Sequence, residues 1–287
     1  MPICMFVSDL HGSTDRYRKL WATIQQERPA AVFLGGDLLP HPGRPTPVSG
    51  LGGHDFLDGL ILPELRRLRR RMGESYPGIF TILGNDDARS EEEGVLRIES
   101  EGLWNYVHAR RIAWGRYLVL GYSFIPPTPF LLKDWERYDV SRFVDPGCVS
   151  PEAGRRTVPV AAAELRHATI ARDLDLLAGG EDLGRAIFLF HTPPYGTVLD
   201  RAALDGQMVE SVPMDVHVGS IAVRRFIEER RPRITLHGHV HESTRLTGEW
   251  RVRLGETHAY TAAHDGPELA LVRFEPEDPA SATRELL

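Results

Sequence analysis

The segment from Thr81 to Arg89, "TILGNDDAR", carries an apolar run into a glycine and then presents Asn85, Asp86 and Asp87 in succession. Gly, Asn and Asp are common turn residues, because glycine tolerates positive φ and Asx side chains bond their own backbone. One interpretation of this segment is therefore an ordinary turn. The other is one corner of a reactive site, and it requires that further strands end in the same way.

Five apolar runs have the composition of buried strands. They are "ICMFVS" at 3–8, "AAVFLGG" at 30–36, "GIFTILG" at 78–84, "RAIFLF" at 185–190 and "RITLHG" at 233–238. Helical spacing of apolar residues between the first three runs predicts alternating βαβ units and a largely parallel sheet. Because ligands of such sheets bind at the carboxyl ends of the strands, the residues that follow each run indicate function.

Metal-binding side chains follow all five runs. They are Asp9 and His11, Asp37, Asn85, His191, and finally His239 and His241. Turn formation explains the Asp and Asn residues but does not account for the four histidines. Imidazole with carboxylate suits zinc, iron, manganese or nickel. Seven ligands are too many for one tetrahedral ion and suit two ions that share a carboxylate, which is the usual clamp for in-line attack on phosphorus.

The rest of the chain favours a single domain over residues 1–287. With 287 residues and 42% hydrophobic content it can form one large domain or two small ones, and neither an internal repeat nor a linker divides it. An irregular, proline-rich insertion at 125–160 is expected to be either a lid or a surface embellishment. Other expected elements are a loop at 40–53, a hairpin at 110–123, helices at 161–178 and 220–230, and strands at 249–254 and 268–275.

Charge and hydropathy exclude several classes of protein. The net charge of −6 provides no global basic field for nucleic acid or an anionic membrane. The arginines of "RRLRRR" at 66–71 are expected to cover the solvated faces of a helix. No apolar run approaches the ~20 residues needed to span a bilayer, and the first residues lack the pattern of a signal peptide. We expect a cytoplasmic protein without a dedicated nucleic-acid surface, and a homo-oligomer is left open.

The ordered series D-x-H, G-D, G-N, H and G-H-x-H, from Asp9 to His241, resembles the calcineurin-like metallophosphoesterases. The segment "HVGSIAVRRFIEERRPRITLHGHVHES" at 217–243 is similar to their Icc-like bacterial and archaeal branch. The resemblance implies an α/β fold, namely a four-layer α/β/β/α sandwich of two mixed sheets flanked by helices.

The resemblance also implies a ligand set for two divalent ions. Asp9, His11 and His241 would hold one ion, Asn85, His191 and His239 the other, and Asp37 would bridge them. A hydroxide bridging the ions would be the nucleophile. Manganese is the usual expectation, with iron, zinc, nickel or magnesium as alternatives.

The function predicted in this way is hydrolysis of small phosphate esters or nucleotides, diesters in particular. A phosphomonoesterase, or a scaffold without catalysis, is the alternative. Asp86 and Asp87 are the catalytic candidates: Asp86 stands where the resemblance places a histidine that assists the leaving group, and Asp87 matches its acidic partner. An ionised Asp86 is a poor proton donor and repels a dianion, so we expect a preference for diesters and good leaving groups. Arg89, Tyr195 and His217 are candidate substrate contacts.

Overall fold

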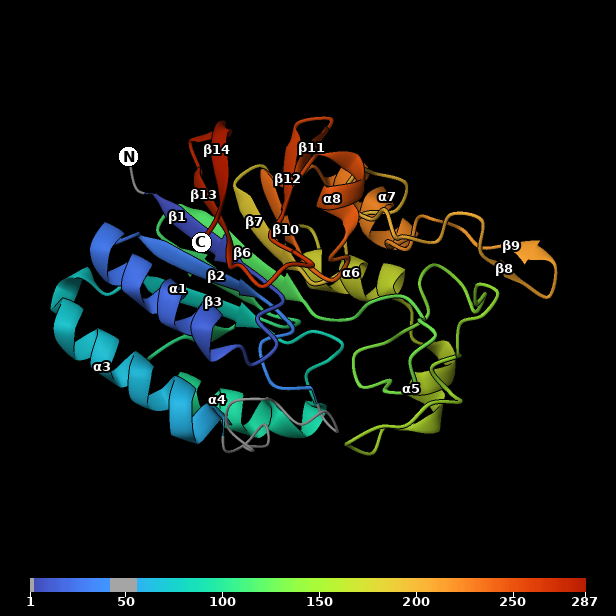
Figure 1. Cartoon of the computed structure of the whole chain (residues 1–287), viewed down its shortest axis with the longest axis horizontal. Helices are drawn as coiled ribbons and strands as arrows, with labels where there is room; N and C mark the ends of the chain where they lie inside the picture. The colour runs from blue at the N-terminus through green and yellow to red at the C-terminus, as the bar shows by residue number, and fades with distance from the viewer. Residues whose placement is uncertain (1–2, 42–55) are drawn as a thin grey trace.

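A computed structural model of the chain describes residues 3–41 and 56–287. Two six-stranded mixed sheets pack against each other, and helices cover their outer faces (Figure 1). The four-layer sandwich expected from the sequence is therefore confirmed. Most of the loop expected at 40–53 lies outside the described residues. Within the described part of the chain, no helix is long and apolar enough to cross a membrane.

The first sheet has the strand order β14-β13-β1-β2-β3-β4. Its parallel strands are β1 (Cys4–Val7), β2 (Ala31–Gly35), β3 (Gly78–Ile82) and β4 (Asn105–Tyr106). Its antiparallel strands are β13 (Ala270–Glu275) and β14 (Asp278–Leu286). Helices α1 (Thr14–Glu27), α3 (Leu62–Met72) and α4 (Glu92–Ser100) lie along its outer side (Figure 1).

The second sheet has the order β11-β12-β10-β7-β6-β5. Its parallel strands are β6 (Tyr117–Tyr122), β7 (Ala186–Phe190), β10 (Ile234–His237) and β12 (Thr257–Thr261). Strands β5 (Arg111–Trp114) and β11 (Arg251–Leu254) are its antiparallel edges. Helices α6 (Ile170–Ala178) and α7 (Ile221–Arg230) pack against each other and contribute to the outer core.

Successive side chains of the central strands point into two different cores. In β1, Cys4 and Phe6 join a cluster between the sheets, whereas Met5 and Val7 join the cluster beneath the helices. Because both faces of these strands are buried, their sequences are almost continuously apolar. This is why the five runs were recognisable as strands.

The five runs are divided between the two sheets: β1, β2 and β3 belong to the first sheet, and β7 and β10 belong to the second. A buried run has the same composition in either sheet, so composition cannot assign it. The predicted site therefore lies where the carboxyl ends of two sheets meet.

The expected hairpin and one of the two expected helices are present, whereas the other helix is divided and two strands were not expected. The hairpin at 110–123 is formed by β5 and β6, and α7 begins after Ser220, whose hydroxyl accepts a hydrogen bond from the Val223 amide. The helix expected at 161–178 is instead two, α5 (Ala162–His167) and α6, because the Thr169 hydroxyl caps a new helix at the Arg172 amide. The expectation missed β12 and also β14, an edge strand that lacks apolar alternation.

Residues 134–139 of the 125–160 insertion, which we call its inner part, form hydrogen bonds with the body of the domain. The Trp135 indole is fully buried and donates to the Asp87 carbonyl at 2.9 Å. The Asp134 carboxylate accepts from the Arg89 amide at 2.9 Å. The Asp139 carboxylate accepts from the Ser220 hydroxyl at 2.5 Å and from the Ile221 amide at 2.7 Å. The expected lid movement, which stays a prediction, could therefore involve only the outer part of the insertion.

We predict that Asp139→Ala lowers the free energy of unfolding by about 1–3 kcal/mol, because it removes a carboxylate that caps α7 and leaves its amides without partners. Urea unfolding followed by circular dichroism measures this change. Asp175→Ala, at an exposed position of α6, is the matched control and is expected to stay within about 0.5 kcal/mol of the parent. Equal stabilities of the two variants would contradict the capping role.

Candidate metal centre

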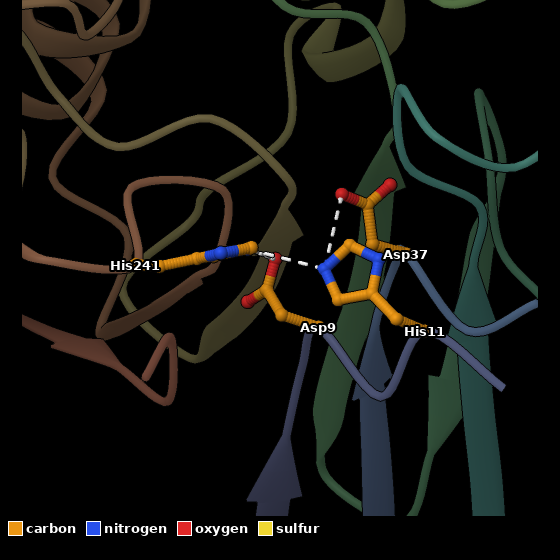
Figure 2. A group of neighbouring side chains, drawn as sticks. All are labelled: Asp9, His11, Asp37 and His241. Atoms are coloured by element: carbon orange, nitrogen blue, oxygen red, sulfur yellow. Dashed lines mark hydrogen bonds and ion pairs between the residues drawn. The ribbon is translucent and has the colours of Figure 1, made fainter. Parts of the chain in front are cut away.

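Four side chains that the sequence predicts as ligands converge in the loops after β1, β2 and β10 (Figure 2). Asp9 and His11 follow β1, Asp37 follows β2, and His241 follows β10. One ligand atom from each lies within 4.8 Å of the others. The Nε2 atoms of His11 and His241 are 3.2 Å apart, and His241 Nε2 lies 3.2 Å from Asp9 Oδ1.

Positive φ angles turn these side chains across the junction. The angle is 56° at Asp9, 47° at His11, 52° at Asp37 and 73° at His239. Such conformations cost about 1–3 kcal/mol each and persist where surrounding contacts enforce them. Here the Asp9 amide donates to the Gly36 carbonyl at 2.9 Å, and the His11 amide donates to the Asp37 carbonyl at 2.7 Å. The loops after β1 and β2 are thus paired beyond the ends of their strands.

A second group of ligand atoms adjoins the first and shares Asp37 with it. His191 Nε2 lies 3.3 Å from Asp37 Oδ2 and 3.0 Å from Asn85 Oδ1. The other ring nitrogen, Nδ1, bonds the Gly35 carbonyl at 2.8 Å, so Nε2 is the nitrogen that faces the ligand atoms and would bind a cation after losing its proton. Gly84 permits this approach, because a Cβ there would lie 2.3 Å from Asp37 Oδ1.

His239 and His237 differ in their surroundings. The His239 ring lies 5.3 Å from the His191 ring between centroids, and its amide donates to Asp9 Oδ1 at 3.0 Å. Both ring nitrogens of His237 have local partners, the Thr192 carbonyl and the Thr235 hydroxyl. His239 is therefore available to the second group of ligand atoms, and His237 has no free lone pair.

The centre is electrostatically suited to divalent cations. Asp9 and Asp37 are 1% and 2% exposed, and no Lys or Arg side chain among the described residues forms an ion pair with either. Burial raises the pKa of Asp37, but His191 and His11 outweigh it and lower the pKa to about 2. Burial opposes charge on His191, but Asp37 and Asp9 raise its pKa to about 10. Protonated imidazoles thus balance the carboxylates, and bound cations would take over this role.

Asp86 and Asp87 occupy different places. Asp86 is partly exposed at the edge of the cluster, with Oδ2 3.7 Å from His11 Nδ1. Burial and then Asp37 raise its pKa, and bound dications would act in the opposite direction. Asp87 is fully buried, and its carboxylate accepts from the amides of Leu38, Leu39 and Gly84. The contacts of Asp87 are those of a positioning residue that ties the Asp37 loop to the Asn85 loop.

The three candidate substrate contacts are not members of the four-residue cluster. The Arg89 guanidinium packs over the Trp135 ring at 5.3 Å and lies 3.6 Å from Glu92. The Tyr195 and His217 rings are neighbours, with centroids 6.0 Å apart. Contact of these residues with substrate stays a prediction.

Sequence reasoning missed residues that support the site. His41 Nε2 lies 3.9 Å from Asp86 Oδ1, and its position four residues after Asp37 was the available signal. The Arg16 guanidinium bonds the carbonyls of Asp9 and Gly266 and so holds the loop after β1. Asp200, buried beneath His217, bonds its Nδ1 at 2.8 Å. Nothing in the sequence near Asp200 indicates this pairing.

Comparison with known proteins identifies the site's relatives. The family model described as calcineurin-like phosphoesterase matches residues 4–243. A search of the curated proteins finds no match.

Among solved structures, the chain is similar to the protein TT1561 of Thermus thermophilus, with 18% identity over 99% of this chain and 98% of that one and a TM-score of 0.57. Another crystal structure matches with 16% identity over 100% and 99% of the two chains and a TM-score of 0.61. At these identities the likeness shows the fold alone. An archaeal phosphodiesterase aligns at 9% identity over 99% of each chain, with a TM-score of 0.41.

We predict that the metal-free protein loses stability as the pH rises from 7 to 10. Against the effect of burial, Asp37 and Asp9 raise the pKa of His191 from 6.5 to about 10, and the hydrogen bond that His241 donates to Asp9 raises the pKa of His241 to about 9. Stability linked to a raised histidine pKa is complete below 6.5 and is lost as the pH passes the folded-state value.

Urea unfolding of chelator-treated protein at pH 7 and pH 9.5 measures this loss, which we expect to be at least ~1 kcal/mol. Loading with a divalent cation should reverse it, because the ion replaces the protons. Higher stability of the metal-free protein at pH 9.5 would contradict the proposed balance of charge.

Proposed function

Because the chain belongs to the calcineurin-like phosphoesterase family, we propose that it is a dinuclear metal-dependent hydrolase of phosphate esters that prefers small diesters. The observation that carries this proposal is the place of Asp37 between two groups of ligand atoms. Its Oδ2 atom lies 4.0 Å from His11 Nε2 on one side and 3.3 Å from His191 Nε2 on the other. A carboxylate in this place suits a bridge between two cations.

In this proposal Asp9, His11 and His241 hold one ion, and Asn85, His191 and His239 hold the other, with Asp37 shared. When bound, the ions supply Lewis acidity that activates a water for attack on phosphorus and neutralises phosphoryl charge. Manganese is the proposed metal, with iron, zinc, nickel and magnesium as alternatives. The mixed imidazole and carboxylate set is compatible with each of the transition metals in this group.

The chain's own side chains orient the reaction. The bond from His191 Nδ1 to the Gly35 carbonyl keeps Nε2 directed at the ligand cluster. Asp87 fixes the loops that carry Asp37 and Asn85 through their backbone amides. Asp86 is the partly exposed carboxylate beside the cluster. An ionised Asp86 repels the dianion of a monoester more strongly than the monoanion of a diester, which supports the preference for diesters.

A phosphomonoesterase acting on a nucleotide or phosphoprotein is the second candidate, since the same pair of ions serves both reactions. A scaffold without catalysis is the third, and the presence of all seven ligand-type residues argues against it. The ratio of diester to monoester hydrolysis separates the first two, and the absence of both activities in metal-loaded protein would favour the third.

We predict that Asp37→Ala abolishes hydrolysis of bis(p-nitrophenyl) phosphate by manganese-loaded protein and reduces the bound metal at both positions. The reason is that one carboxylate contributes to both groups of ligand atoms. Release of p-nitrophenolate and elemental analysis of dialysed protein measure the two effects. Asp58→Asn, at an exposed carboxylate remote in sequence from every predicted ligand, is the control. Full activity in Asp37→Ala would refute the bridging assignment.

We predict that Asp86→Asn improves kcat/KM for p-nitrophenyl phosphate about tenfold more than for bis(p-nitrophenyl) phosphate. One additional negative charge ~6 Å from a carboxylate, at an effective dielectric constant of ~40, costs about 1.4 kcal/mol, or a factor of ten. Both esters release the same leaving group, so their ratio isolates the charge of the substrate. An unchanged ratio, or a larger gain for the diester, would show that Asp86 does not select against monoesters.

A further inference from the structure

Tyr195 and His217 lie at the same end of the second sheet as the ligand loops. Tyr195 comes four residues after His191, and its amide donates to the Ser220 carbonyl at 3.0 Å. The segment 201–203 pairs with His217 on one side, through Arg201, and bonds Glu242 on the other, through the Ala203 amide. Glu242 directly follows His241. Tyr195 therefore lies on the segment that leaves His191, and His217 is linked through residues 201–203 to the residue that follows His241.

The hydrogen bonds of His217 fix which of its nitrogens accepts. Its Nδ1 lies 2.8 Å from Oδ1 of Asp200, a fully buried carboxylate that also accepts from the amides of Gly196 and Thr197. A carboxylate that accepts from three amides, Gly219 being the third, is an acceptor, so His217 Nδ1 carries the proton. In this tautomer Nε2 is the ring nitrogen that carries the lone pair. No described residue bonds this atom, and the side chain is 33% exposed.

The hydroxyl proton of Tyr195 is also used in a hydrogen bond. Its hydroxyl donates to Asp215 Oδ2 at 2.7 Å, and Asp215 Oδ1 accepts from the His217 amide at 2.9 Å. The hydrogen bond to Asp215 raises the pKa of Tyr195 to about 12, so the phenol stays neutral. A phenol oxygen that donates its proton keeps lone pairs for one further partner. The exposed face of Tyr195 therefore also offers an acceptor.

An exposed pair of acceptors backed by carboxylates discriminates between ligands. Phosphoryl oxygens are acceptors and would be repelled by Asp215 and by the lone pairs of both side chains. Hydroxyl groups donate, and so would gain a hydrogen bond from each. Two neighbouring guanidinium groups already have partners: Arg224 bonds the carbonyls of Tyr195 and Gly196 and the Glu228 carboxylate. Arg201 bonds the Ala202 carbonyl and Asp205. The pair thus favours an uncharged ligand with several donors.

We propose that Tyr195 and His217 form a subsite for the hydroxyl groups of a sugar-like alcohol portion of the substrate, such as a ribose, with Asp200 and Asp215 as positioning residues. This inference rests on the proposed phosphoester hydrolysis and specifies its substrate class. The metal centre takes the phosphate, and the acceptor pair takes hydroxyl protons of the organic group. Simple aryl esters gain nothing from the pair.

The test uses two diesters that release the same p-nitrophenolate: thymidine 5′-(p-nitrophenyl phosphate), which carries a sugar hydroxyl, and bis(p-nitrophenyl) phosphate, which carries none. For the thymidine ester we expect His217→Phe and Tyr195→Phe each to raise KM about 3- to 10-fold, as for the loss of one hydrogen bond. The aryl ester should change less than twofold. His167→Phe, at an exposed position of α5, is the control. Equal losses on both esters, or no loss on either, would overturn the subsite.

A second measurement needs neither metal nor catalysis. In ¹⁵N-histidine-labelled, metal-free protein, the signals missing in His217→Phe identify His217, and we expect an unprotonated Nε2. Methyl β-D-ribofuranoside should shift that Nε2 signal, whereas inorganic phosphate should not. A protonated Nε2 or a response to phosphate alone would refute the proposal. The ribofuranoside response would uphold the subsite even if metal-loaded protein hydrolysed no ester, so the two proposals can fail separately.

Discussion

Two buried carboxylates whose ion-pair partners among the described residues are imidazoles are the constraint on which this structure depends. Asp9 and Asp37 are held at the junction of the two sheets, where desolvation of an uncompensated charge costs several kcal/mol. Imidazoles compensate part of this charge, His241 for Asp9, and His191 and His11 for Asp37. The amides of His239 and Asp86 donate to the two carboxylates as well. The left-handed conformations at Asp9, His11 and Asp37 and the absence of a side chain at Gly84 serve this one convergence.

The arrangement is held by a chain of contacts that runs outward from the junction. Asp87 binds the amides of the loops after β2 and β3, and its own carbonyl accepts from Trp135 in the insertion. Asp139, further along the insertion, caps α7, which begins shortly after His217. The insertion therefore connects the cluster beside Asn85 with the neighbourhood of the proposed sugar subsite, which gives it a structural role whether or not its outer part moves.

Many of the strands and four of the site residues were predictable, because they depend on short stretches of the sequence. Runs such as 3–8 and 78–84 are buried on both faces and so are visible as strands, and the residues after them named the cluster Asp9, His11, Asp37 and His241. The division of the strands between two sheets was not predictable from their composition, which is the same in both. Contacts between segments distant in sequence were also not predicted. Examples are Asp200 with His217 and His41 with Asp86, whose spacing along the chain does not indicate that they meet.

The central claim is that Asp37 bridges two cations, and electron paramagnetic resonance of the manganese-loaded protein tests it most directly. Titration with Mn²⁺ should saturate at two ions per chain and give the spectrum of an exchange-coupled pair, because a shared carboxylate keeps the ions ~3.5–4 Å apart. Saturation at one ion, or only the six-line spectrum of isolated Mn²⁺ at two ions per chain, would contradict the account.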